Sequence, residues 1–237
     1  AAVCASHATL MAVTAGLPQR MLVAHGSEEQ KRELLPPLAS GAWFGAFCLS
    51  EPHAGSDASA IRTRARRTAE GWRLSGTKAW VTGGGEADLY LVLAVTQPDA
   101  GVRGVSAFLV AGDSPGLAFG APERKLGQHA AVTTTITFDD VFVPADRLLG
   151  REGQGFVMAM ASLDGGRVGI AAQAVGIGRA AFEAARVYAD QREAFGRPVR
   201  TFQGVAFPLA DMATRLDAAR LLTWRAASAL DRGERAT

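Results

Sequence analysis

The sequence is short of the features that mark several common classes of protein. Its 237 residues include two cysteines, four histidines and only 7% aromatic residues. Cys4 and Cys48 lie far apart and outside any CxxC pair, so they favour a reducing compartment over a disulfide framework. The histidines show no zinc-ligand spacing among themselves or with the cysteines: His7, His25, His53 and His129. We therefore expect no metal site.

A large net charge and long apolar runs are also lacking. A formal net charge of +2 gives no reason to expect nucleic acid or an anionic membrane as a partner. No apolar stretch approaches the ~20 residues that a membrane span needs. The first residues, AAVCASHATL, lack the charged and apolar regions of a secretory signal and read as the middle of a helix. We expect a cytoplasmic globular protein, and a chain that lacks both ends of a longer one.

Helical patterns come first in the sequence. Residues 1–17 are rich in alanine and predict a helix, which Pro18 follows. In SEEQKRELLPPLASG, Ser27 and Gln30 have the spacing of a capping box, which predicts the start of a second helix. We expect Pro36 and Pro37 to limit that helix.

From Trp43 the pattern changes to short runs rich in β-branched and aromatic residues. Strands follow strands without intervening helices, which predicts an antiparallel sandwich or barrel. In this region Arg62, Arg64 and Arg66 alternate, as expected for the solvated outer face of a strand.

The run GGG at 83–85 lies between AWVT and DLYLVLAV, and taken alone it predicts a hairpin turn. The hairpin would place Trp80 and Thr82 on one strand face, two residues apart. An indole beside a hydroxyl suits a flat heteroaromatic ligand, which needs a stacking surface and a hydrogen bond in its plane.

Helical periodicity returns after Gly155, over residues 155–194 and again from about Gln203. Five glycines in the first of these helices suggest that another helix or a ligand approaches its backbone closely: Gly165, Gly166, Gly169, Gly176 and Gly178. We expect Pro208 to bend the second helix or to delay its start. The sequence thus predicts an α+β fold: the end of an N-terminal helical domain (1–41), a middle β-domain (42–150) and two helices of a C-terminal bundle (151–237).

One long polar loop, CLSEPHAGSDASA, follows a buried strand at residues 48–60. It resembles the signature of the acyl-CoA dehydrogenases, whose constrained positions are filled here by Cys48, Leu49, Ser50, Glu51, Ala54, Gly55, Ser56, Asp57 and Ala60. The resemblance continues in order through LSGTKAWVTGG, RKLGQHAAVTTTITFDDVFVP, GQGFVMAMASLDGGRVGIAAQAVGI and QREAFG, and covers essentially the whole chain. It is greatest to the short-chain, butyryl-type branch.

The resemblance implies FAD as cofactor and assigns residues to it. Trp80 matches the residue that stacks beside the flavin ring, and Thr82 the residue whose hydroxyl reaches N5. Ser50 stands in the place of a hydroxyl that bonds the flavin. The complete set of cofactor positions implied in this way is Phe47, Cys48, Leu49, Ser50, Ser56, Trp80, Val81, Thr82, Arg192 and Gln203.

For the substrate, an acyl-CoA, the resemblance implies Ser56, Asp164 and Arg167. Taken alone, Asp164 and Arg167 are simply an ion pair at helical spacing. Arg192 and Gln203 match residues that reach the FAD of a neighbouring subunit, which implies a homo-oligomer, a tetramer or a dimer.

The implied reaction is FAD-dependent α,β-dehydrogenation in fatty-acid β-oxidation, with electrons passing to an electron-transfer flavoprotein. The catalytic carboxylate is expected beyond Thr237, because Gly166 occupies its alternative position on the long helix. Two alternatives remain: a relative of the flavin monooxygenases or nitroalkane oxidases, and a non-catalytic FAD-binding fragment. The sequence departs from the family at Gly83, where Asn is usual, and at Ala131, which lacks the usual hydroxyl.

Overall fold

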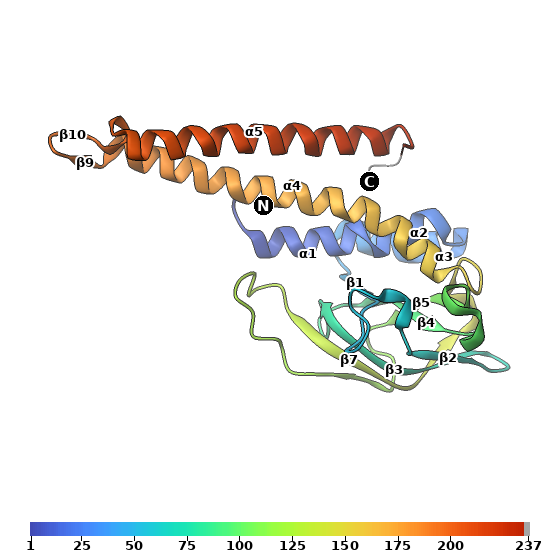
Figure 1. The fold of residues 1–237 in the computed structure, drawn as a ribbon. Helices are drawn as coiled ribbons and strands as arrows, with labels where there is room; N and C mark the ends of the chain where they lie inside the picture. The colour runs from blue at the N-terminus through green and yellow to red at the C-terminus, as the bar shows by residue number, and fades with distance from the viewer. Residues whose placement is uncertain (235–237) are drawn as a thin grey trace. The chain divides into compact units, whose positions relative to one another are not determined.

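The computed structural model describes residues 1–234, which fall into two compact units. The larger unit comprises residues 10–166 and contains the β-sheet, and the other comprises residues 1–9 and the chain from Arg167 onward. Two helices, α1 (Ala5–Gly16) and α4 (Gly155–Gln191), contribute residues to both units (Figure 1).

Two further helices belong to the larger unit, α2 (Pro18–His25) and α3 (Glu28–Ser40). Pro18 occupies the start of α2, where its missing N–H costs no helical hydrogen bond. The predicted capping box of α3 is confirmed: the Ser27 hydroxyl accepts from Gln30 N at 3.2 Å, and Gln30 Oε1 accepts from Ser27 N at 3.0 Å.

The prediction that two prolines limit α3 is wrong. Pro36 and Pro37 lie inside the helix, which continues to Ser40. Leu34 and Leu38 on either side of them are 3% and 2% exposed. Their burial in the core stabilises the turn that the prolines weaken.

The sheet has eight strands in the order β6-β7-β3-β2-β4-β5-β8, with β1 also paired to β4. Their bounds are β1 Gly45–Cys48, β2 Arg64–Arg67, β3 Gly71–Thr82, β4 Leu89–Val95, β5 Val105–Ala111, β6 Leu117–Phe119, β7 Thr133–Pro144 and β8 Leu148–Leu149. Short 3-10 turns connect some of them: η1 Ala58–Ala60, η2 Pro98–Gly104 and η3 Ala145–Arg147.

The sheet is mixed, which corrects the expectation of a wholly antiparallel sandwich or barrel. Both β1 and β2 run parallel to β4, and no closed barrel is found among the described strands. The hairpin predicted at 83–85 does not form, because β3 pairs with β2 and β7 and is separated from β4 by β2. The two parallel partners of β4 are β1 and β2, which both precede it in the chain.

β4 lies between two hydrophobic cores. Leu89, Leu91 and Leu93 pack in the first core, with residues of α2, α3 and the start of α4. Tyr90, Val92 and Ala94 pack in the second core, with residues of β3, β5 and β7. Burial on both faces accounts for the nearly unbroken apolar run LYLVLAV.

The arginines of β2 lie as predicted. Arg64 and Arg66 are exposed, whereas Ala65 between them is buried. The alternation therefore marks a solvated outer face.

In the other unit, α4 leads through the short strands β9 (Glu193–Ala194) and β10 (Arg197–Pro198) and the turn η4 (Val199–Thr201) to α5 (Gln203–Asp231). Pro208 lies inside α5 and does not delay its start. The expected close approach to glycine is confirmed at Gly178, where a Cβ would lie 2.9 Å from Leu216 Cδ2, but nothing lies near Gly169. Residues 235–237 of the predicted third domain lie outside the described part.

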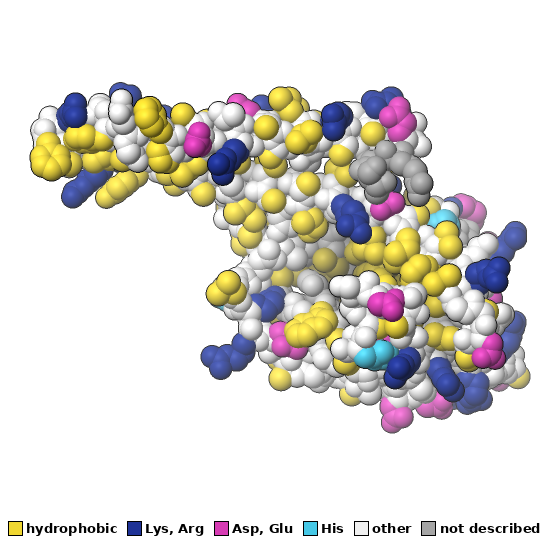
Figure 2. All heavy atoms as spheres, in the orientation of Figure 1, with side chains coloured by type: hydrophobic (Ala, Val, Ile, Leu, Met, Phe, Trp, Pro, Cys, Tyr) yellow, Lys and Arg dark blue, Asp and Glu magenta, His cyan; other side chains and the backbone are white. Residues whose placement is uncertain are grey.

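Apolar side chains run along the α4–α5 pair (Figure 2). The exposed large ones on α5 are Phe207, Met212, Leu221, Leu222 and Trp224. None of the described helices is both long enough and apolar enough to cross a membrane.

Candidate functional site

The polar loop after β1 is ordered by its own polar groups. Glu51 and Ala54 form an isolated bridge, each amide donating to the other residue's carbonyl at 3.0 Å. Farther along, the Asp57 carboxylate accepts from Ser59 N at 3.2 Å and caps η1. The loop is therefore a folded element, and its many hydroxyl and carboxyl groups are those that such turns use.

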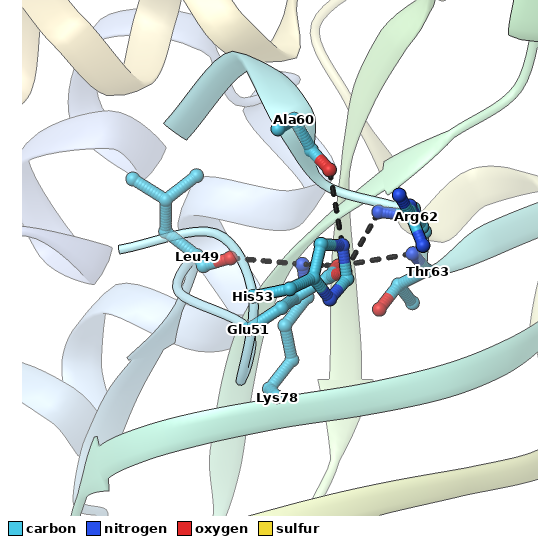
Figure 3. A network of polar contacts seen from close by, with 7 residues as sticks. All are labelled: Leu49, Glu51, His53, Ala60, Arg62, Thr63 and Lys78. Atoms are coloured by element: carbon cyan, nitrogen blue, oxygen red, sulfur yellow. Dashed lines mark hydrogen bonds and ion pairs between the residues drawn. The ribbon is translucent and has the colours of Figure 1, made fainter. Parts of the chain in front are cut away.

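The Glu51 side chain fastens this loop to the sheet. Its carboxylate accepts hydrogen bonds from Arg62 N at 2.7 Å and from Thr63 N at 2.9 Å. Lys78 Nζ on β3 donates to Glu51 Oε1 at 2.8 Å and to the Leu49 carbonyl at 3.0 Å. Figure 3 shows these groups converging on one point between the loop and β3.

Both charges of this pair are buried, with Lys78 0% and Glu51 3% exposed. Burial alone would raise the pKa of Glu51, but the Lys78 charge and the hydrogen bonds hold that pKa below its ordinary value of 4.5. Burial lowers the pKa of Lys78, against the opposing effect of the Glu51 charge. Removing either partner would leave the other group buried without its counter-charge, so the stability of the pair depends on both partners.

His53 closes the loop from the solvent side. Its Nε2 lies 3.1 Å from the Ala60 carbonyl and 3.6 Å from Glu51 Oε2. The sequence reading missed both His53 and Lys78 as parts of the site. The one signal for Lys78 was a lysine within the strand segment LSGTKAWVT, where a buried strand normally carries an apolar residue.

A β-bulge in β3 presents Trp80. The pairing of β3 with β7 shifts by one residue between Lys78 and Val81. Trp80 has a left-handed backbone with φ of 59°, and its residue is 63% exposed. Such a conformation is rare for a bulky residue, and bulges often redirect a side chain next to a functional site.

The bulge, rather than the predicted hairpin, sets the relation of Trp80 to Thr82. Thr82 is half-buried, whereas Val81 between them is 1% exposed and packs in the second core. The Ser50 carbonyl accepts from Ala79 N at 2.9 Å, which places Ser50 beside the bulge. The structure thus places Ser50 next to the β3 segment that carries Trp80 and Thr82, and their role toward a flavin stays a prediction.

Other predicted cofactor residues have buried side chains. Cys48 and Val81 pack in the second core and Leu49 in the first, so only their main chains could meet a ligand. Burial raises the pKa of the Cys48 thiol to about 12. Phe47 is half-buried against the first core, and Ser56 is exposed in the loop.

The remaining predicted residues lie on the long helices. Asp164 and Arg167 are three positions apart on α4. Arg192 directly follows α4, and Gln203 is the first residue of α5. Their roles toward substrate or cofactor stay predictions.

Three residues at or next to the bulge, Ser50, Trp80 and Thr82, carry polar side-chain groups. Within residues 1–234 the hydroxyls of Ser50 and Thr82 and the indole N–H of Trp80 make no hydrogen bond to the protein. An exposed indole on a strand segment that also carries Thr82, and that is hydrogen-bonded to Ser50, offers a stacking surface and hydroxyls for a flat heteroaromatic ring such as isoalloxazine. No group of three or more His, Cys, Asp or Glu that could hold a metal is found in the same part of the chain.

Three family models match the chain in order. They are described as acyl-CoA dehydrogenase, N-terminal domain (residues 1–42), middle domain (46–141) and C-terminal domain (153–237). The signature loop, β3 and Trp80 all fall within the middle-domain match.

Individual relatives agree with these matches. The chain is 49% identical over 224 residues to an acyl-CoA dehydrogenase of Bacillus subtilis, which covers 94% of this chain and 59% of the relative. It is 47% identical to the mitochondrial short-chain specific acyl-CoA dehydrogenase of Bos taurus, over 96% of this chain and 55% of the relative. The structure of butyryl-CoA dehydrogenase from Megasphaera elsdenii matches with a TM-score of 0.95 and 43% identity, over 98% of this chain and 61% of that one. The chain therefore spans well under two thirds of the length of these relatives.

Proposed function

The chain belongs to the acyl-CoA dehydrogenase family, and we propose that its bulge and signature loop hold FAD for the α,β-dehydrogenation of an acyl-CoA thioester. The observation that carries this proposal is the exposed Trp80 with its left-handed backbone, on the β3 segment that also carries Thr82 and is hydrogen-bonded to Ser50. A bulky residue in this strained backbone is expected where a functional site requires it.

Each of these residues has a distinct task toward the cofactor. The Trp80 ring supplies a stacking surface for the isoalloxazine, and the Thr82 and Ser50 hydroxyls fix its angle. A neutral hydrogen bond of this kind is worth about 0.5–1.5 kcal/mol net, so its value lies in orientation more than in affinity. When bound, FAD supplies a hydride acceptor at N5 for the β-hydrogen of the substrate.

The substrate and assembly residues complete the proposal. Ser56 lies along the pantetheine arm of the CoA thioester, and Asp164 and Arg167 face the acyl group. Arg192 and Gln203 reach the FAD of another subunit in a homodimer or homotetramer. The α-proton is removed by a carboxylate outside residues 1–237, and electrons leave to an electron-transfer flavoprotein. Fatty-acid β-oxidation in the cytoplasm is the setting in which we place this reaction, with a short-chain substrate.

The test is an anaerobic titration of the FAD-loaded whole protein with butyryl-CoA. We expect the flavin absorbance to bleach and to recover when electron-transfer flavoprotein is added. Turnover that consumes oxygen without the flavoprotein would favour the monooxygenase or oxidase alternative. Tight FAD binding without bleaching by any acyl-CoA would favour a non-catalytic FAD-binding protein. A failure to bind FAD would refute the proposal itself.

A further inference from the structure

We propose that the buried Lys78–Glu51 pair is a positioning device, which locks the signature loop to the bulge and thereby sets the orientation of Trp80 in the flavin site. The inference rests on the proposed function only for the identity of the ligand that Trp80 meets. Neither residue is expected to touch that ligand. They act through the backbone on either side of them.

The first support is the number of elements that meet at the Glu51 carboxylate. It receives N–H groups of Arg62 and Thr63, at the end of the loop, and the ammonium of Lys78 from β3. Lys78 Nζ also bonds the Leu49 carbonyl, at the start of the loop. One ion pair thus holds both ends of the loop against a single point of the sheet (Figure 3).

The second support is where that point lies in β3. Lys78 is the last residue in register with β7 before the bulge, and it is paired with Ile136. The next residue, Ala79, donates its N–H to the Ser50 carbonyl at 2.9 Å. Two successive residues of β3 are therefore bonded to the loop, and Trp80 follows immediately with φ of 59°.

The third support is energetic. A well-packed apolar pair of similar volume often stabilises a fold as well as a buried ion pair does. Charge is therefore not needed here for stability alone. What charge adds is direction, because hydrogen bonds to ionised groups are short and fixed in geometry. A residue keeps an unfavourable backbone conformation such as that of Trp80 only when several surrounding contacts fix it.

The experiment compares three variants of the whole protein: Glu51→Gln, Lys78→Met and the double variant. The double variant removes both charges and leaves similar volume, so we expect its thermal unfolding midpoint to return toward that of the wild type. We expect its FAD dissociation constant to stay raised by about tenfold or more, because small misplacements in a site are costly. The reduction potential and the visible spectrum of the bound flavin are also expected to shift.

A flavin-free measurement makes the result independent of the proposed function. In the apoprotein, amide hydrogen exchange over residues 52–60 and at Ala79 is expected to be at least about tenfold faster in the double variant. If the wild-type protein binds no FAD, the proposed function fails, and this exchange measurement alone still decides the positioning claim. If the double variant does not fold, the same measurements on Glu51→Gln below its unfolding temperature replace it.

The matched control is the exposed pair of α3, in which Lys31 Nζ lies 3.0 Å from Glu28 Oε1. Lys31→Met with Glu28→Gln should leave stability, FAD affinity and exchange in the loop unchanged. A double variant at Lys78 and Glu51 with wild-type exchange, affinity and flavin spectrum would overturn the proposal. The pair would then be a structural contact only.

Discussion

Replacing Trp80 by glycine and, separately, by alanine measures the backbone strain at the proposed flavin site. Trp80 has φ of 59°, a region that costs a residue with a Cβ about 1–2 kcal/mol and glycine almost nothing. Both substitutions remove the same indole, so its contacts cancel in the comparison. We expect the glycine variant to have a free energy of unfolding about 1 kcal/mol higher than that of the alanine variant.

The sign of this difference is the diagnostic result. At an ordinary position inside a strand, glycine is less stable than alanine by about 0.5–1 kcal/mol. Arg66 on β2 provides such a position, since it is exposed and lies outside the left-handed region. Urea unfolding of the four variants should therefore give opposite signs at Trp80 and Arg66. An alanine variant at Trp80 more stable than the glycine variant would refute the argument that this backbone is strained.

The same variants separate stability from function. Neither glycine nor alanine offers a stacking surface, so both should bind FAD more weakly than the wild type. Trp80→Phe keeps a ring and the strain, and it should retain most of the affinity. If the glycine variant is more stable than the alanine variant and yet binds FAD more weakly than the wild type, Trp80 is a residue kept for its ligand. Equal FAD affinity in all the variants would remove Trp80 from the site.

Three further predictions follow from the same region. Gly83→Ala should lower the free energy of unfolding by about 2–4 kcal/mol, since φ is 81° there and a Cβ would overlap the Phe44 ring; urea unfolding measures it. Thr82→Val should shift the flavin reduction potential and weaken FAD binding more than Thr137→Val, and equal shifts would contradict the assignment of Thr82. Glu51 has a lowered pKa, so its contribution to stability is full above its ordinary pKa of 4.5 and is lost as the pH falls through the lower folded value. Glu51→Gln should flatten this acid-limb dependence, and an unchanged pH profile of stability would count against it.

Local signals in the sequence predicted local structure well. Ser27 and Gln30 form their capping box because both partners lie within one turn of the chain. The helices α4 and α5 were predicted because the helical periodicity of each lies within one continuous segment. The family was recognisable because its signature, which contains Ser50, is contiguous in the sequence. Trp80 and Thr82 lie in a second contiguous match, LSGTKAWVTGG, and their role toward a flavin stays a prediction.

Pairing at long range was not predictable in the same way. The turn at Gly83–Gly85 has the composition of a hairpin, but strand neighbours are chosen by the whole sheet, and β2 separates β3 from β4. Nothing in the sequence around Lys78 indicates that the Glu51 carboxylate, 27 residues away, will neutralise its charge. The left-handed conformation of Trp80 was hidden for a similar reason, because tertiary contacts impose it against local preference.

The pairing of β3 with β7 also has a consequence for synthesis of the chain. β2 precedes β3 and can pair with it at once, but Thr82 at the end of β3 must wait for Thr133 at the start of β7. Ribosomes add about 5–20 residues per second, so this edge of β3 remains open for roughly 3–10 s after it is made. An open strand edge that is followed in the sequence by an apolar run such as β4 is a site for wrong pairing between nascent chains. We therefore expect chaperone dependence during translation to be concentrated in this interval, and to end once β7 has emerged.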